Sequence, residues 1–329
     1  TPGWIRRRRI RRGSFFCHNP GVSEPVLVVG PGAVGLSLAA GLRRAGLPVA
    51  ILGRDASAER RLQREGFTVT GPTGATSKIF GLTSARALKT SASAAFFCVK
   101  SGDARRAAAA ARRYIGPGTS VVALQNGIGH EKVFRRAFGP KRTVIGVCYF
   151  AADRASQGEL RLNGGEDILL ARHSGNETAL EAARALLTNA GFRVHLKDSE
   201  EGMLWTKAAF NAAVNPLGAA CAVESGRIEA DPALREIALA ALGEAAAAAL
   251  ASGHHLDYPD MAGKLMLSCR NAPRQRNSML QDLAAGRRTE ARAILGPLLL
   301  AAKRRRVPAP TLEILSAVIA RLERSRAKK

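Results

Sequence analysis

Three polar side chains share one face of a segment that is otherwise apolar. Lys207, Asn211 and Asn215 are spaced four residues apart on a predicted helix over Leu204–Val214 and just beyond, so they form a single stripe. A solvated helix face usually carries several charges, whereas this stripe has one Lys and two carboxamides. Because desolvation lowers the pKa of an ammonium group, Lys207 is a candidate proton donor. A solvent-facing stripe remains the alternative.

A second polar group runs from Asn277 to Glu290. Ser278 and Asp282 are four residues apart and share a predicted helix face. Gly286 predicts a break, and Glu290 is expected in the first turn of the following helix. Acidic residues in a first turn often only complement the helix dipole, so Glu290 is structural or functional with equal weight from spacing alone.

A glycine pattern, Gly30-x-Gly32-x-x-Gly35, follows the apolar strand predicted at Val26–Val29 and opens a helix. Gly30 permits a tight turn, Gly32 allows a pyrophosphate to approach the backbone, and Gly35 allows close helix–sheet packing. A second strand is predicted at Val49–Leu52. This β-turn-α-β unit is typical of dinucleotide binding, and an ordinary glycine-rich turn is the alternative.

The end of the second predicted strand indicates which dinucleotide is bound. Enzymes that use NAD usually carry an acid there for the ribose 2′-hydroxyl, whereas an Arg accommodates the 2′-phosphate of NADP. Here Gly53 occupies the acid position and Arg54 follows it, which favours NADP. Asp55 comes next, and it could cap a helix or contact a ribose.

Two more polar segments follow predicted strands. Lys100 ends the strand Ala94–Val99, and Gln125-Asn126-Gly127 ends the strand Ser120–Leu124. The carboxyl ends of strands line the ligand crevice in open α/β sheets. Lys100 could instead be a surface residue, and the second segment could be a simple turn or could place amide groups beside a nicotinamide.

The order of these elements predicts the fold class. Further strands are expected at Thr143–Phe150 and Ile168–Ala171, and alternation of strands with helices predicts an α/β fold with a mainly parallel, doubly wound, Rossmann-like sheet. After about Asp198 the segments are helical, so an all-helical C-terminal domain should follow. We expect a cofactor-binding domain over 26–198 and a helical substrate domain over 199–329.

Residues 1–25 differ from the remainder. The segment is rich in Arg and has no acidic residue before Glu24. An Arg-rich, acid-poor segment is also found in transit peptides, but we expect a disordered extension.

The composition narrows the class of protein. The chain has 329 residues, 46% of them hydrophobic, and a net charge of +24. A basic surface attracts phosphates, acidic metabolites and nucleic acid, but zinc-finger spacing and RNA-binding signatures are absent, so nucleic acid is an unlikely partner. The five cysteines are widely spaced, which favours a reducing compartment and a cytoplasmic location. The sequence predicts no membrane span and no metal site, and a homodimer is possible.

Taken together, these motifs resemble the ketopantoate reductase family, over about residues 26–329. The matching pieces are Gly30–Gly35, Arg54, Val99-Lys100, Gln125-Asn126-Gly127, Leu204–Lys207, Asn211, Asn215-Pro216-Leu217, Ser278–Asp282 and Arg288-Thr289-Glu290. The glycine-rich turn is shared with many dehydrogenases, whereas the Lys–Asn–Asn helix and the Ser-Met-x-x-Asp and Thr-Glu pieces are specific in combination.

The resemblance implies NADPH-dependent reduction of ketopantoate to pantoate in pantothenate biosynthesis, with a small 2-oxo acid as the substrate. It implies Lys207 as the general acid and Glu290 as a second catalytic residue. The substrate-binding residues that it implies are Asn126, Asn211, Asn215 and Ser278. Those implied for the cofactor are Gly30, Gly32, Ala33, Val34, Gly35, Arg54, Lys100, Asn126 and Glu290. Asp103 departs from the family, because some members have an uncharged polar residue there near the adenosine.

Two other functions remain open from the sequence. The first is an NADPH-dependent reductase of a different small 2-oxo acid. The second is a non-catalytic NADP-binding sensor, against which the retention of Lys207, Asn211 and Asn215 argues.

Overall fold

The computed structural model describes residues 24–156 and 158–326, which form two compact units. Of these described residues, one unit comprises those up to Gln125 together with those of His130–Glu200, and the other comprises Asn126–Gly129 together with those from Glu201 on. The expected Arg-rich extension lies outside the described residues except for Glu24 and Pro25. We describe each unit by itself.

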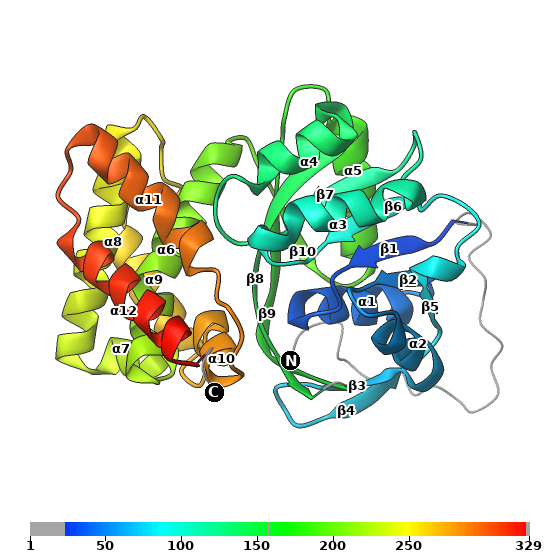
Figure 1. Cartoon of the computed structure of the whole chain (residues 1–329), viewed down its shortest axis with the longest axis horizontal. Coiled ribbons are helices and arrows are strands. Elements are labelled where there is room, and N and C mark those ends of the chain that lie inside the picture. The colour runs from blue at the N-terminus through cyan, green and yellow to red at the C-terminus, as the bar shows by residue number, and fades with distance from the viewer. Residues whose placement is uncertain (1–23, 157, 327–329) are drawn as a thin grey trace. The chain divides into compact units, whose positions relative to one another are not determined.

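The first unit alternates strands and helices (Figure 1). Its strands are β1 (Val26–Val29), β2 (Val49–Leu52), β3 (Phe67–Thr70), β4 (Thr76–Ile79), β5 (Leu82–Ser84), β6 (Ala94–Phe97), β7 (Ser120–Ala123), β8 (Thr143–Ser156), β9 (Glu159–Ala171) and β10 (Arg193–Lys197). Its helices are α1 (Ala33–Arg44), α2 (Ala56–Glu65), α3 (Ala104–Ala111), α4 (His130–Phe138) and α5 (Glu177–Asn189).

The strands form one sheet in the order β4-β3-β9-β8-β7-β6-β1-β2-β5, with β10 paired to β9. The run from β8 to β5 is parallel throughout, so the predicted Rossmann-like, mainly parallel sheet is confirmed. Only the pairs β3–β4 and β8–β9 are antiparallel among the described strands. The carboxyl ends of β1, β2, β5, β6 and β7 therefore meet at one edge.

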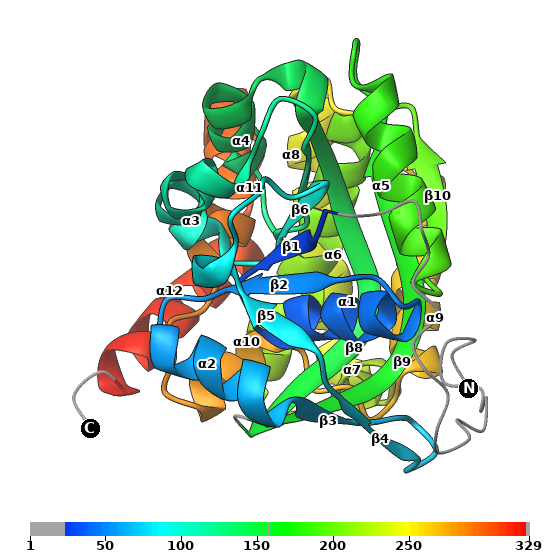
Figure 2. The same ribbon diagram turned by 90° about the vertical axis from the view of Figure 1, so that its right-hand side faces the viewer.

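Helices cover the sheet on both faces. Helix α1 packs against α5, and helix α3 packs against α4; Figure 2 shows the two pairs on opposite sides of the sheet. The strands β1, β2, β6 and β7 are buried along their whole length. Burial on both faces explains why each of them is a short, nearly continuous apolar run.

Four strands were not predicted from the sequence. β3, β4 and β10 mix polar with apolar residues and have intermediate or exposed positions, and β5 is only three residues long. β10 covers Arg193–Lys197, so the segment before the expected helical region is a strand rather than a break. Half-exposed strands have no continuous apolar run to mark them.

The second unit contains no strand among its described residues. Its helices are α6 (from Glu200 to Cys221), α7 (Ser225–Ala230), α8 (Pro232–Ala251), α9 (Met261–Asn271), α10 (Ser278–Ala284), α11 (Ala291–Arg305) and α12 (Pro310–Arg326). The predicted all-helical C-terminal region is confirmed. α6 is longer than the predicted Leu204–Val214 at both ends, because its burial continues from Gly202 to Ala219.

Among the described residues, the structure contains no helix with both the length and the apolar character needed to cross a bilayer.

Candidate functional site

The glycine-rich turn joins β1 to α1 and is shaped by close backbone contacts. Gly30 has φ of +94°, a conformation that favours glycine, and its N–H donates to the Leu52 carbonyl at 2.8 Å. A Cβ at Gly35 would lie 2.1 Å from the Gly30 carbonyl oxygen. Gly35 therefore lets α1 begin directly against the strand.

Gly32 differs from the other two glycines. A Cβ added there would meet no atom within 4 Å, so the space beside it is not filled by protein. Gly32 is the N-cap residue of the twelve-residue helix α1, without a side-chain cap and without an acid in the first turn, where Ala33 and Val34 lie. An uncapped helix N-terminus with free space before it fits a pyrophosphate.

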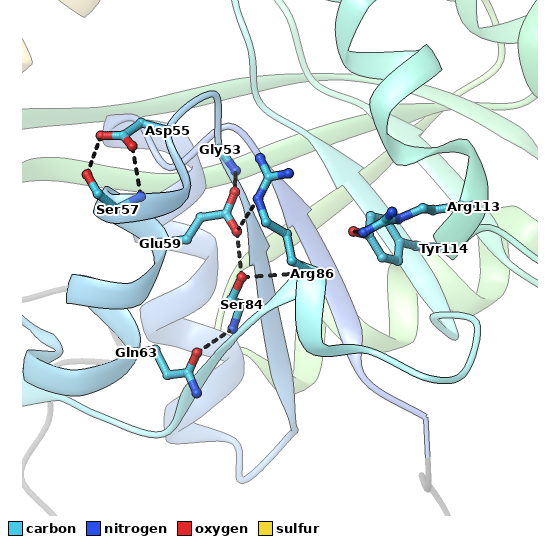
Figure 3. Close-up of polar contacts among 9 residues, drawn as sticks. All are labelled: Gly53, Asp55, Ser57, Glu59, Gln63, Ser84, Arg86, Arg113 and Tyr114. Carbon is cyan, nitrogen blue, oxygen red and sulfur yellow. Dashed lines mark hydrogen bonds and ion pairs between the residues drawn. The ribbon is translucent and has the colours of Figure 1, made fainter.

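The end of β2 carries an unpaired cation. Arg54 is exposed and has no hydrogen bond or ion pair within the described part of the chain. Asp55 accepts hydrogen bonds from the Ser57 N–H and the Ser57 Oγ, each at 2.8 Å (Figure 3), and the hydroxyl bond in particular lowers the pKa of Asp55. Of the two alternatives for Asp55, the structure contains the helix cap.

Lys100 and Gln125 follow β6 and β7 at the same edge of the sheet. Lys100 is half-buried and precedes a short turn of 3-10 helix, Ser101–Asp103. Asp103, the departure from the family pattern, pairs with Arg106 at 2.6 Å. Gln125 is buried, and neither its Oε1 nor its Nε2 has a hydrogen-bond partner in the described residues. A buried carboxamide without partners is costly, which makes Gln125 a further candidate for a ligand contact.

The stripe on α6 is not a solvated helix face. Asn211 and Asn215 are 8% and 6% exposed, and Lys207 is half-buried. The segment between α8 and α9 contacts this helix: Trp205 stacks on His254 with ring centroids 4.2 Å apart, and the Thr206 Oγ1 accepts the Asp257 N–H at 2.8 Å. The alternative of a solvent-facing stripe is wrong, because these carboxamides lie in the interior.

Asn126 connects two of the sequence-predicted site residues of the helical unit, Asn211 and Glu290. Its Oδ1 accepts a hydrogen bond from the Asn211 Nδ2 at 3.3 Å, and its Nδ2 donates to the Glu290 Oε2 at 3.2 Å. The segment is held close to α11, since the Ile128 N–H donates to the Ala293 carbonyl and a Cβ at Gly127 would lie 2.5 Å from that oxygen. The fold thus aligns two carboxamides and one carboxylate.

Glu290 does not lie in the first helical turn as predicted. It is the N-cap residue of α11, and its side chain makes no capping hydrogen bond; the Thr289 Oγ1 accepts the Ala291 N–H instead, at 3.1 Å. Since Thr289 caps the helix, the Glu290 carboxylate can face Asn126. A carboxylate at the N-terminus of α11 also complements the helix dipole, so this geometry is compatible with both the structural and the functional alternative.

Glu323 was missed by the sequence analysis. Its Oε1 accepts both the N–H and the Oγ1–H of Thr289, each at 2.7 Å, and so it holds the residue that precedes Glu290. Glu323 lies in α12, far along the chain from Thr289, and no motif spacing connects the two residues.

Ser278 and Asn215 are not joined to this chain of hydrogen bonds. Ser278 is exposed at the start of α10 and makes no side-chain hydrogen bond within the described residues. Its neighbour Asn277 caps α10 through the Leu280 N–H at 2.9 Å and donates to the Val214 carbonyl of α6 at 3.4 Å. Asn277 therefore fixes α10 against the helix that carries Lys207.

Both units match models of a known protein family. The model described as "Ketopantoate reductase PanE/ApbA" matches residues 26–175, and the one described as "Ketopantoate reductase PanE/ApbA C terminal" matches residues 201–323. Together they cover most of the chain.

Individual relatives agree with this family. The 2-dehydropantoate 2-reductase of Halobacterium salinarum is 27% identical, over 89% of this chain and 97% of its own length. The crystal structure of a PanE/ApbA family ketopantoate reductase from Ralstonia eutropha JMP134 is 26% identical and superposes with a TM-score of 0.80, over 92% of this chain and 99% of that one. A D-mandelate dehydrogenase in ternary complex with NADH and anilino(oxo)acetate has a TM-score of 0.84 at 20% identity, over 92% and 99% of the two chains, which shows the shared fold.

Proposed function

The chain belongs to the ketopantoate reductase family, and on this premise we propose that it reduces ketopantoate to pantoate with NADPH, as a step of pantothenate biosynthesis. It is an oxidoreductase with a nicotinamide cofactor and a small keto acid as its substrate. The proposal adds the identity of the oxo acid, the preference for NADPH, and the roles of individual residues.

The sheet unit holds the cofactor in this proposal. The N-terminus of α1, with Gly30, Gly32, Ala33, Val34 and Gly35, receives the pyrophosphate. Arg54, exposed and without a counter-charge in the described residues, binds the 2′-phosphate that distinguishes NADPH from NADH. Lys100, shortly after β6, contributes a further positive charge at the same edge.

The helical unit holds the oxo acid and supplies the proton. NADPH, when bound, supplies a hydride to the 2-carbonyl carbon, and negative charge then develops on the carbonyl oxygen. Lys207 stabilises that oxygen and donates its proton from Nζ. Asn211 and Asn215 orient the substrate, and Ser278 binds the substrate carboxylate. Asn126 and Glu290 contact both the substrate and the nicotinamide end of the cofactor.

The observation that carries the proposal is the hydrogen-bonded chain Asn211–Asn126–Glu290, whose first member lies four residues from Lys207 on α6. Its members come from three segments far apart in sequence, and each ranks among the residues that the family resemblance implies. Carboxamides and a carboxylate held in this way are pre-organised to bind a polar acid in one orientation.

The test is the oxidation of NADPH, followed at 340 nm, with ketopantoate, 2-oxoisovalerate, pyruvate and phenylglyoxylate, each repeated with NADH. We expect the highest kcat/KM for ketopantoate with NADPH. A clearly higher value for another acid would assign the chain to a different 2-oxo acid, and no turnover with any acid, despite NADPH binding, would favour a sensor.

A further inference from the structure

A fully buried carboxylate ties together two strand ends at the edge of the sheet. The Glu59 side chain of α2 is 0% exposed. It accepts hydrogen bonds from the Gly53 N–H at 2.9 Å and from the Ser84 Oγ at 2.6 Å (Figure 3). Gly53 follows β2 and Ser84 ends β5, so one acid fixes the position of both strand ends.

The same carboxylate holds an arginine. The Arg86 Nε lies 3.4 Å from the Glu59 Oε2, and the Arg86 N–H donates to the Ser84 Oγ at 3.3 Å. The Arg86 side chain is still 44% exposed. Its two terminal nitrogens have no hydrogen-bond partner in the described residues, so they remain able to bind a ligand.

Arg86 lies at the edge where the cofactor residues are found. β5 pairs in parallel with β2, with Ile51 opposite Ser84, so Arg86 follows β5 as Arg54 follows β2. Figure 3 shows the Arg86 guanidinium beside Gly53. Gly53 in turn approaches the glycine-rich turn, since a Cβ there would lie 3.4 Å from the Pro31 Cγ.

Two guanidinium groups at one edge suit a phosphate rather than a diol. Arg presents a planar set of donors that matches phosphate oxygens, and a phosphate dianion can use two cations. The pyrophosphate is already assigned to the N-terminus of α1, whereas Arg54 and Arg86 follow the two outer strands β2 and β5.

We propose that Arg86 is a second cationic contact for the phosphate on the adenosine ribose, held in place by Glu59, and that it sets the cofactor preference together with Arg54. This inference rests on the proposed use of NADPH. It adds a specificity-determining residue that no sequence motif indicated.

The experiment is equilibrium titration of NADPH and NADH against the full chain and its Arg86→Ala, Arg86→Lys and Arg54→Ala variants. Arg64→Ala is the matched control, because Arg64 is an exposed cation at the other end of α2, paired with Glu65. We expect Arg86→Ala to weaken NADPH binding about tenfold while NADH binding changes less than about twofold. Arg86→Lys should recover part of the NADPH affinity. The NADPH affinity of Arg86→Lys should also fall more steeply with rising salt concentration than that of Arg86→Ala.

The outcomes separate the inference from the proposed function. If Arg54→Ala removes the NADPH preference and Arg86→Ala leaves it intact, Arg86 does not bind the phosphate although the proposed cofactor stands. An equal loss of NADPH and NADH affinity in Arg86→Ala would show that Arg86 only supports the fold. If the unmodified chain binds both cofactors equally, the proposed NADPH preference fails, and the inference fails with it.

Discussion

Asn126 and Glu290 are 164 residues apart in the chain, and their side chains are joined by a hydrogen bond of 3.2 Å. A carboxylate has lone pairs for several hydrogen bonds, so Glu290 can accept one more from a substrate hydroxyl while the bond from Asn126 keeps its orientation.

This geometry predicts how the substrate is discriminated. Ketopantoate carries a 4-hydroxyl that 2-oxoisovalerate lacks, and an acceptor left unpaired should cost about 10- to 150-fold in kcat/KM. Glu290→Ala should reduce the ratio of the two kcat/KM values by a larger factor than it lowers kcat/KM for 2-oxoisovalerate. Measuring kcat/KM for both acids on both proteins checks this. Values within about threefold of each other in the unmodified chain would contradict it.

Lys207→Ala should lower turnover by roughly 10²–10⁴-fold, the usual range for the loss of a general acid. NADPH affinity should be unchanged in a direct titration. Lys303→Ala is the control, because Lys303 is an exposed cation at the end of α11 and its loss should not affect turnover. Near-normal turnover in Lys207→Ala would remove Lys207 from the mechanism.

Glu323→Ala should impair the site from a distance. Two hydrogen bonds of 2.7 Å to Thr289 are lost, which should lower the free energy of unfolding by about 1–3 kcal/mol. Because Thr289 then no longer fixes Glu290, kcat/KM for the oxo acid should fall about tenfold while NADPH affinity is retained. Glu313→Ala, an exposed acid on the same helix, should have neither effect. Normal kcat/KM in a destabilised Glu323→Ala would restrict Glu323 to a structural role.

Two glycine substitutions in the same turn should have opposite consequences. Gly35→Ala places a Cβ 2.1 Å from the Gly30 carbonyl oxygen, so the melting temperature should fall, with a loss of about 2 kcal/mol or more. Gly32→Ala meets no protein atom within 4 Å and should change stability by less than about 1 kcal/mol. Its Cβ enters the expected pyrophosphate space, so dinucleotide affinity should drop strongly. Unchanged affinity in Gly32→Ala would place the pyrophosphate elsewhere.

His130 predicts a pH dependence of stability. The ring is buried, and neither nitrogen has a partner in the described residues. Burial lowers the pKa of the imidazole from 6.5 to about 4, and Glu131 opposes this shift. Unfolding lets the ring take up a proton below pH 6.5, so stability is complete above that pH and is lost as the pH falls towards 4.

Between pH 8 and pH 5 this one residue should cost about 2 kcal/mol of unfolding free energy. The free energy of unfolding, measured by urea titration, should therefore change less between the two pH values for His130→Leu than for the unmodified chain. The same change in both proteins would show that His130 is not responsible.

The sequence predicted those features that depend on local pattern. β1 and β2 were located because four consecutive apolar residues precede glycine-containing turns. The polar stripe of α6 followed from helical spacing. β4 was invisible, because Thr76–Ile79 is largely exposed and lacks the apolar run by which strands are recognised.

Long-range pairing was beyond the reach of sequence patterns. Spacing suggested Asn126, Asn211 and Glu290 one by one, but only the fold shows that Asn126 bonds to both of the others. In the sequence, Glu59 resembles an ordinary acid near the start of a helix. Its burial against Gly53 and Ser84 is visible only in the fold, because it brings three separate segments together.

The segment Asn126–Gly129 belongs to the helical unit although it is flanked on both sides by the sheet unit. No single cut in the chain can therefore yield an intact helical unit. A fragment that starts at Glu201 would lack Asn126, and with it the link between Asn211 and Glu290. Fragment complementation, domain exchange between homologues and circular permutation would each have to keep these four residues with the helical unit.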